Sequence, residues 1–307
     1  MAEVLTLTFN PCIDKSTSIP LLVPEKKLRC TAPKFEPGGG GINVARAMNR
    51  LGGSARALYP AGGYSGKFLN KLLEEENIPT VVVETGSHTR ENIIVLEAEK
   101  NHQFRFGMPG SPLSEAEWRQ CLKEVEKAPD VSYVVASGSL PPGVPAAVLA
   151  ELAAIVKKKG ARLVVDTSGE ALQQAVSGGV YLLKPNLGEL SLLVGRQELK
   201  EEEVEDCARE LIKKGNSEIV VVSMGAKGAL LVTATESFRV VAPKVPMQST
   251  VGAGDCMVAG LVLSLSQGAS LKEALQMGVA CGTAATMNPG TGLCQPEDVE
   301  YLLAVIR

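Results

Sequence analysis

The chain has 307 residues, of which 45% are hydrophobic and 21% are charged, the composition of an ordinary globular protein. This length corresponds to about two domains of 150 residues, or to one large α/β domain with an appendage. The formal net charge of −3 gives no electrostatic reason to expect a nucleic acid or an anionic membrane as a partner. Any anion binding must therefore come from local geometry.

Cysteine and histidine usage excludes further classes of protein. The seven cysteines are odd in number and form no Cys-x-x-Cys pair, which excludes a disulfide framework and a zinc ribbon. A zinc hydrolase or a histidine-based triad needs more imidazoles than His88 and His102 supply. There is no signal-peptide pattern, and no apolar run reaches the roughly 18 residues of a membrane span. We expect a cytoplasmic enzyme.

The first third of the chain predicts a small β-sheet made from two separate segments. Strands are expected at 18–23, 28–35, 92–98 and 103–108, with turns at Pro24-Glu25 and Asn101-His102 and with helices at about 42–51 and 67–76. A sheet assembled from segments at about 15–36 and 88–109 would have one exposed face. We therefore expect it to act as a lid, covering a cleft or a second subunit.

From residue 131 onward, short apolar strands alternate with helices. Strands are expected at 131–136, 161–166, 181–184 and 218–223, and helices at 148–159 and about 202–214. Two further helices, at about 253–267 and 271–287, have no strand between them. This alternation predicts a mostly parallel, Rossmann-like sheet with helices on both faces, which is a three-layer α/β fold.

Glycines 38–41 lead directly into the helix that contains Asn43. Glycine lets backbone amides approach a ligand closely, and a helix start adds unpaired N–H groups. The alternative is a flexible turn with a loose helix entry. The pattern is neither the dinucleotide fingerprint nor a Walker A loop, because the required glycines and the Gly-Lys-Ser/Thr sequence are missing.

A second small-residue turn, Gly252-Ala253-Gly254, comes just before Asp255 and an apolar helix. The structural interpretation is that an acid in the first turn stabilises the helix dipole. The functional interpretation is a phosphoryl-transfer site, in which the three amides hold the charge of the moving phosphoryl group and Asp255 accepts the acceptor hydroxyl's proton. Because a helix N-terminus lowers a carboxylate's pKa, we expect Asp255 to be a weak base that mainly orients the hydroxyl.

These two motifs resemble the two signatures of the ribokinase-like (PfkB) family of carbohydrate kinases. The resemblance covers nearly the whole chain in the same order, and it is strongest to the branch that phosphorylates fructose 6-phosphate, at 27–33, 35–46, 138–143, 168–172 and 248–255. Ser249, in place of the family's usual acid, is a feature of that branch. Asn10-Pro11 is more similar to the 1-phosphofructokinase and tagatose-6-phosphate kinase branch.

The resemblance implies a sugar-phosphate site. Its residues would be Asp14, Gly39, Gly40, Asn43, Arg90 and Ser139, with Lys27 and Arg29 approaching across a homodimer contact made by the lid. A sugar phosphate also needs cations, and the predicted small-sheet segments carry Lys27, Arg29, Arg90 and Arg105. These four can also be solvated strand charges, which for Arg105 taken alone is the simpler interpretation.

The resemblance also places ATP. Asn186 and Glu189 are similar to the Asn-x-x-Glu motif that organises Mg²⁺ on the nucleotide phosphates, and Lys184 would reach those phosphates. From the residues alone, Asn186 and Glu189 form a helix capping box. The nucleotide turn would include Ser223, Gly225, Lys227 and Gly228, and the adenine would lie against Val279 and Thr283. As bare residues, these last two are more often core.

A broken helix end at 285–292 completes the set of motifs. Its freed carbonyls resemble the family's monovalent-cation site, with K⁺ held by oxygens of Ser249, Val251, Ala285, Asn288, Gly290 and Gly292.

We therefore expect ATP-dependent phosphorylation of fructose 6-phosphate at O1, with Mg²⁺ and K⁺. The alternatives are 1-phosphofructokinase, tagatose-6-phosphate kinase, or a non-catalytic sugar-phosphate sensor.

Overall fold

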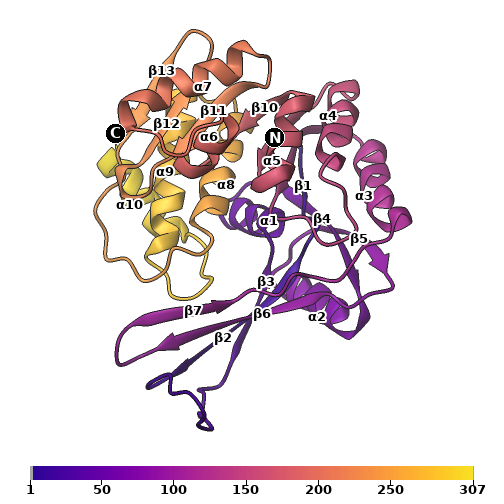
Figure 1. Cartoon of the computed structure of the whole chain (residues 1–307), viewed down its shortest axis with the longest axis vertical. Helices are drawn as coiled ribbons and strands as arrows, with labels where there is room; N and C mark the ends of the chain where they lie inside the picture. The colour runs from indigo at the N-terminus through magenta and orange to yellow at the C-terminus, as the bar shows by residue number, and fades with distance from the viewer. Residues whose placement is uncertain (1–2, 307) are drawn as a thin grey trace.

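The computed structural model describes residues 3–306 and contains a nine-stranded sheet with a separate four-stranded sheet below it (Figure 1). The large sheet has the order β13-β12-β11-β10-β9-β8-β1-β4-β5. Its strands are β1 (Glu3–Leu7), β4 (Ala55–Gly62), β5 (Thr80–Thr85), β8 (Val131–Ser137), β9 (Arg162–Asp166), β10 (Val180–Leu183), β11 (Ser217–Ser223), β12 (Ala229–Val232) and β13 (Ser237–Val240). At one edge of this sheet, the pairs β11–β12 and β12–β13 are antiparallel, and the other pairs of the described sheet are parallel.

Along each strand, successive side chains pack alternately into two separate cores, one on each face of this sheet. On β8, Val134 belongs to one core and Val135 to the other, and on β11 Val220 and Val221 divide in the same way. Strands buried on both faces must be apolar at every position, which explains their continuous Val, Leu and Ile runs. The three-layer α/β prediction is confirmed.

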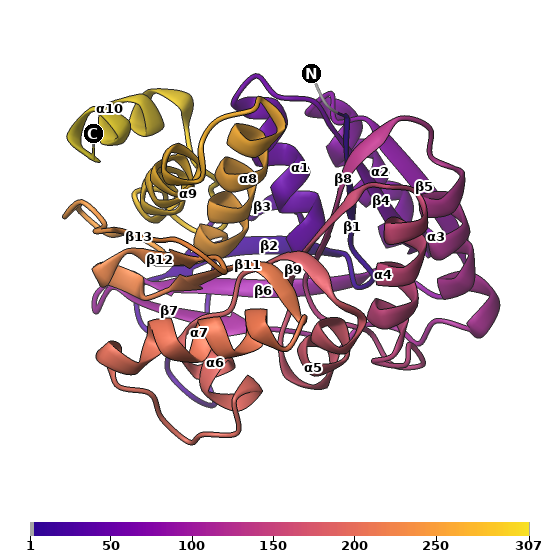
Figure 2. The same ribbon diagram turned by 90° about the horizontal axis from the view of Figure 1, so that it is seen from above.

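Two layers of helices cover the faces, and Figure 2 shows the sheet between them. One layer consists of α1 (Gly40–Arg50), α2 (Gly63–Glu75), α8 (Ala253–Ser266), α9 (Leu271–Thr286) and α10 (Pro296–Ile306). The other consists of α3 (Glu115–Lys127), α4 (Val148–Lys158), α5 (Gly169–Gly178), α6 (Leu187–Leu193) and α7 (Val204–Lys213). Across residues 3–306, we find no helix with the length and apolar character that crossing a membrane requires.

The small sheet has the order β3-β2-β6-β7 and comes from two distant parts of the chain. Its strands are β2 (Cys12–Ile19), β3 (Lys34–Gly38), β6 (Arg90–Glu97) and β7 (His102–Phe106). β2 pairs parallel with β6, and each also pairs antiparallel with one further strand. A separate small sheet is therefore confirmed, with the predicted turn at Asn101, whose φ is 51°.

The two earlier strands of the small sheet were placed wrongly by the sequence. The strand predicted at 18–23 ends at Ile19, and the strand predicted at 28–35 begins only at Lys34. Proline has no N–H to donate to the hydrogen bonds between strands. Three prolines, Pro20, Pro24 and Pro33, lie between β2 and β3 and interrupt strand pairing there. The chain there forms an irregular excursion with a turn at Pro24-Glu25.

Candidate active site

The candidate site lies where the carboxyl ends of the central parallel strands meet the first turns of α1 and α8. In parallel α/β sheets, ligands bind at this edge. Ser137 and Asp166 end β8 and β9, and Lys184 follows β10. Asn43 comes from α1 and Asp255 from α8, so five separate parts of the chain meet here, three of which carry the predicted residues Asn43, Lys184 and Asp255.

The glycine run owes its composition first to close packing. A Cβ at Gly40 would lie 2.3 Å from Ser137 Oγ, and one at Gly41 would lie 2.7 Å from the Leu7 carbonyl oxygen. Helix α1 begins at Gly40, and Gly39 adopts a φ of 111°. The Ile42 amide donates to Thr8 Oγ1 at 2.8 Å. Gly40 and Gly41 thus let the start of α1 lie directly on β1 and β8, a role that the ligand-based interpretation missed.

Asp255 is held from two elements. Asn43 Nδ2 donates to its Oδ2 at 2.9 Å, and Ser137 Oγ donates to its Oδ1 at 3.4 Å. Burial, followed by the nearby charge of Asp166, raises the pKa of Asp255 to about 7, although the Asn43 and Ser137 hydrogen bonds and Lys184 act against the rise. The prediction of a lowered pKa is therefore wrong, because desolvation and a like charge outweigh the helix dipole.

The turn before Asp255 leaves backbone amides at the start of α8 outside the helical hydrogen-bond pattern. Gly252 has a left-handed φ of 74°, and its carbonyl accepts the first backbone bond of α8, from the Cys256 amide at 2.8 Å. The N–H groups of Ala253 and Gly254 therefore precede the hydrogen-bonded turns of the helix and form part of the positive end of its dipole. This arrangement suits an anion.

A buried ion pair stands beside that turn. Lys184 Nζ lies 3.1 Å from Asp166 Oδ1, and a Cβ at Gly254 would lie 3.6 Å from the same Nζ. Burial opposes the charge of Lys184, but Asp166 outweighs it and the pKa of Lys184 is raised. The sequence motifs did not include Asp166, although an acid at the end of an apolar strand indicates a candidate site residue.

The predicted sugar residues gather on β2, β6 and the loop after β8. Asp14 is buried, and its Oδ1 accepts a hydrogen bond from Asn92 Nδ2 at 2.9 Å. Arg90 donates to the carbonyls of Met108 and Asn10, while its Nε is buried without a partner among the described residues. A buried, unpaired guanidinium nitrogen suits an anionic ligand. Asn92 was not singled out by the sequence.

Asn10 joins the two sides of a cleft of about 630 Å³. Its side-chain Nδ2 donates to Ser139 Oγ at 3.1 Å, and its backbone carbonyl accepts a hydrogen bond from Arg90. Asn10, Arg90 and Ser139 all line this cleft, so three residues from separate parts of the chain meet around one space.

The other predicted cations lie farther out. Arg105 on β7 is exposed and donates to Thr250 Oγ1 at 3.1 Å, so the small sheet contacts the chain just before Gly252. Lys27 and Arg29 are exposed in the irregular segment between β2 and β3, and neither lines the cleft that Asn10, Arg90 and Ser139 share.

The predicted nucleotide residues occupy adjacent strand ends. Asn186 and Ser223 form an isolated parallel bridge. Asn186 and Glu189 form the capping box at the start of α6, with the Glu189 amide donating to Asn186 Oδ1 at 2.9 Å. Among residues 3–306, no group of three or more His, Cys, Asp and Glu side chains is arranged to hold a metal ion, so a Mg²⁺ ion here would depend on the nucleotide phosphates for ligands.

The other residues predicted to bind the nucleotide differ in their exposure and in their contacts. Gly225 and Gly228 form the turn after β11 with positive φ angles, and a Cβ at Gly228 would collide with the Val240 carbonyl. Lys227 is exposed and its Nζ pairs with Glu201 at 2.6 Å. Val279 and Thr283 are both buried on α9, and Val279 belongs to the core between α9 and the sheet.

The predicted cation residues form two hydrogen-bonded segments. Ser249 Oγ donates to the Gly290 carbonyl at 2.7 Å and accepts from the Val251 amide at 3.2 Å. Helix α9 ends at Thr286, and the Asn288 amide donates to the Ala285 carbonyl at 3.2 Å, while the Gly292 amide donates to the Pro289 carbonyl. The negative end of the α9 dipole thus points at a set of neutral oxygens, which suits a monovalent cation.

An acid in the first turn of a helix at the carboxyl edge of a parallel sheet, beside a buried lysine, suits a phosphoryl-transfer site. The chain matches the model of the pfkB family carbohydrate kinases over residues 2–298 and is 47% identical over its whole length to the ATP-dependent 6-phosphofructokinase isozyme 2 of Escherichia coli, 99% of which is covered. The chain belongs to the pfkB family of carbohydrate kinases.

Solved structures agree with this assignment. The fold matches the crystal structure of the phosphofructokinase-2 from Escherichia coli in complex with potassium, with a TM-score of 0.96 and 47% identity, over 100% of this chain and 99% of that one. It also matches the complex of that enzyme with fructose-6-phosphate, with a TM-score of 0.95 and 46% identity over the same shares of the two chains.

We predict that Asp255→Asn stabilises the protein at neutral pH. The pKa of Asp255 rises from 3.8 in the unfolded chain to about 7 in the folded protein. Between these two pH values the unfolded state releases the proton and the folded state keeps it, so the parent loses stability as the pH rises from about 4 to about 7. The variant lacks this loss and should be more stable above pH 7 by up to about 4 kcal/mol. Urea unfolding at pH 4, 6 and 8 measures the difference. Glu300→Gln, at an exposed acid on α10, is the control and should follow the parent; an equal gain for Asp255→Asn at all three pH values contradicts the assignment.

Proposed function

We propose that the protein transfers the γ-phosphoryl group of ATP to O1 of fructose 6-phosphate. The observation that carries the proposal is the position of Asp255, held by Asn43 and adjoining the free amides of Ala253 and Gly254. A carboxylate with a pKa near 7 accepts a proton at physiological pH, and amides beside it stabilise negative charge that moves past them.

In the proposed reaction, O1 attacks the γ-phosphorus while the bond from that phosphorus to the β-γ bridging oxygen breaks. The proton of O1 passes to Asp255, and ADP leaves. In a loose transition state the proton leaves late, so the main task of Asp255 is to aim the hydroxyl. Ala253 and Gly254 hold the charge on the equatorial oxygens.

The sugar phosphate is proposed to lie between the small sheet and the large one. Asp14 would accept hydrogen bonds from sugar hydroxyls, and Arg90 and Ser139 line the adjoining cleft. Gly39 and Asn43, at the start of α1, are proposed to contact the sugar from the other side. The small sheet acts as a lid that excludes water and so suppresses ATP hydrolysis. The contact of Arg105 with Thr250 shows that this sheet already reaches the loop before Gly252.

The nucleotide is proposed to lie along the ends of β10 and β11. Lys184 reaches its phosphates, and Asn186 with Glu189 orients Mg²⁺ on those phosphates through water. The turn at Ser223, Gly225, Lys227 and Gly228 and the α9 residues Val279 and Thr283 surround the nucleoside. The ion pair of Lys227 with Glu201 and the burial of Val279 require local rearrangement for these last contacts.

The first test compares turnover of fructose 6-phosphate, fructose 1-phosphate and tagatose 6-phosphate with ATP and Mg²⁺. We expect fructose 6-phosphate to have the highest kcat/KM, and Asp255→Ala to lower kcat by about a thousandfold or more with ATP affinity retained, because the aspartate acts on the acceptor. A preference for either other sugar would favour the alternative that Asn10-Pro11 suggests. Ligand-induced thermal stabilisation without turnover would favour a sensor, and loss of ATP binding in Asp255→Ala would contradict the assigned role.

Monovalent-cation activation is proposed at Ser249, Val251, Ala285, Asn288, Gly290 and Gly292. Neutral carbonyl and hydroxyl oxygens beside a helix C-terminus favour K⁺, and the loop lies next to Gly252, whose geometry K⁺ would stabilise. We expect kcat to rise several-fold when tetramethylammonium chloride is replaced by KCl at constant ionic strength. Equal rates in the two salts would exclude this site.

We also propose a homodimer through the lid that brings Lys27 and Arg29 to the partner's sugar phosphate. Their exposure, and their absence from the cleft lined by Arg90 and Ser139 in the same chain, support this assignment. Arg29→Ala should raise the KM for the sugar phosphate about tenfold, because a guanidinium binds phosphate with charge-assisted bonds, and should leave the KM for ATP unchanged. Lys26→Ala, three residues away and also exposed, is the control. A monomer by light scattering, or an effect on ATP alone, would contradict the proposal.

A further inference from the structure

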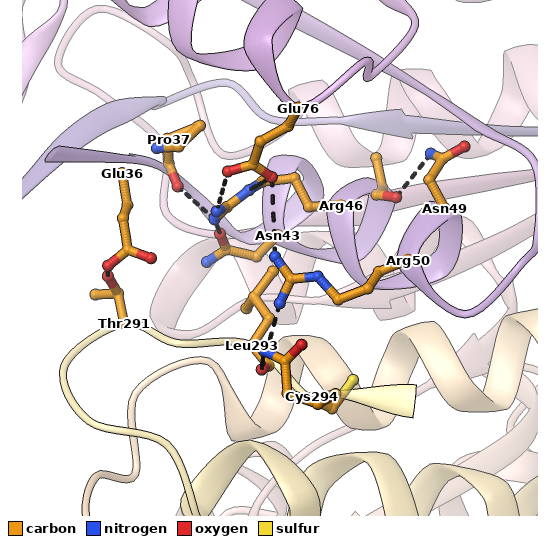
Figure 3. A network of polar contacts seen from close by, with 12 residues as sticks. Glu36, Pro37, Asn43, Arg46, Asn49, Arg50, Glu76, Thr291, Leu293 and Cys294 are labelled. Atoms are coloured by element: carbon orange, nitrogen blue, oxygen red, sulfur yellow. Dashed lines mark hydrogen bonds and ion pairs between the residues drawn. The ribbon is translucent and has the colours of Figure 1, made fainter. Parts of the chain in front are cut away.

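Arg46 is buried in the middle of α1, one turn beyond Asn43, and it makes four hydrogen bonds (Figure 3). Its Nε and one terminal nitrogen donate to the two carboxylate oxygens of Glu76 at 2.8 and 2.5 Å. Its other terminal nitrogen donates to the Pro37 carbonyl at 2.8 Å and to Asn43 Oδ1 at 3.3 Å. The planar guanidinium fork is therefore fixed by partners on three sides.

The contact with Asn43 determines which way the amide of Asn43 points. An amide presents an oxygen on one side and an NH₂ group on the other. Because Arg46 only donates, it holds Oδ1 toward itself, and Nδ2 then faces Asp255 Oδ2 at 2.9 Å. With the amide reversed, an oxygen would face the carboxylate and the hydrogen bond would become a repulsion.

Glu76 holds Arg46 in place from another helix. Glu76 is the C-cap residue, directly after the last residue of α2, and its bidentate pair with Arg46 joins the end of α2 to α1. A bidentate carboxylate pair fixes the plane of a guanidinium as well as its distance. The chain Glu76, Arg46, Asn43 and Asp255 therefore connects the surface end of α2 to the carboxylate at the cleft.

We propose that Arg46, anchored by Glu76, is a positioning residue that orients Asn43 and thereby keeps Asp255 ionised and aimed. The inference rests on the proposed role of Asp255 and adds to it a residue that touches no substrate. It also identifies the end of α2, outside the sugar and nucleotide sites, as part of the apparatus that controls the proton acceptor.

The other groups around Asp255 come from different elements. Asp166 at the end of β9 raises the pKa of Asp255, and Lys184 after β10 lowers it. Ser137 on β8 donates to Asp255, and the thiol of Cys12 on β2 lies close enough to interact with it electrostatically. None of them contacts Arg46 by a hydrogen bond or ion pair given for residues 3–306. A substitution at Arg46 therefore reaches Asp255 through Asn43.

The main test is the pH dependence of kcat for Arg46→Lys between pH 5.5 and 9.5 at saturating substrates. Lysine keeps the charge but lacks the fork that serves Glu76 and Asn43 together. Without a fixed donor from Asn43 the pKa of Asp255 rises further, so we expect the acid limb of the profile to move to higher pH. At pH 7, kcat should fall roughly fivefold to tenfold and recover near pH 9, with the KM for ATP unchanged.

Arg50→Gln provides the matched control. Arg50 lies one turn farther along α1 and also approaches Glu76, at 4.0 Å, but its hydrogen bond goes to the Leu293 carbonyl and not to Asn43 (Figure 3). Its profile should match that of the parent. If Arg46→Lys does not fold, Glu76→Ala replaces it, because Glu76 is 31% exposed and its removal opens no buried cavity. It should give a smaller shift in the same direction.

A double-mutant cycle and an activity-independent measurement complete the test. In an Asn43→Ala background, Arg46→Lys should cause no further shift, whereas additive effects would overturn the proposal. In Arg46→Lys, the pH range over which the free energy of unfolding declines should also extend to higher pH. Urea denaturation measures this change without enzyme turnover. If neither the acid limb of the kcat profile nor the pH range of declining stability moves, the inference is overturned even when the kinase is active. Absence of transfer to any of the three sugar phosphates, together with a shifted stability curve, contradicts only the proposed function.

Discussion

The hydrogen bond from Asn43 to Asp255 joins the first turns of α1 and α8 across the carboxyl edge of the large sheet. At the start of α1, a side chain at Gly40 or Gly41 would collide with neighbouring backbone, so this helix start is fixed in one position. The positive ends of the two helix dipoles lie on either side of this hydrogen bond. The remaining site residues are arranged around this junction.

The opposing effects on Asp255 explain why its chemistry differs from that of an ordinary N-terminal acid. The helix dipole and the bonds from Asn43 and Ser137 favour the charged form, whereas burial and Asp166 favour the neutral form. The balance lies near neutral pH. A site that excludes water and gathers carboxylates produces this balance without a histidine, which agrees with the scarcity of imidazole in the chain.

The sequence predicted the alternating second half of the fold well, because strands buried on both faces and amphipathic helices leave strong patterns there. It did not predict β4, whose apolar run contains Pro60, nor β12 and β13 at the sheet edge. Contacts between distant segments leave no local pattern. The roles of Asn92 and the buried Arg46 therefore became visible only in the folded chain, although the motifs containing Asn43 and Asp255 were found.

The parallel pairing of β2 with β6 has a consequence for how the chain acquires its shape. The 70 residues between these strands include β4, β5, α1 and α2, all of which belong to the main body. The small sheet thus depends on long-range pairing that becomes possible only after about a third of the polypeptide has emerged from the ribosome, and closing so long a loop is slow. Until β6 and β7 arrive, β2 and β3 have unpaired edges exposed to other nascent chains.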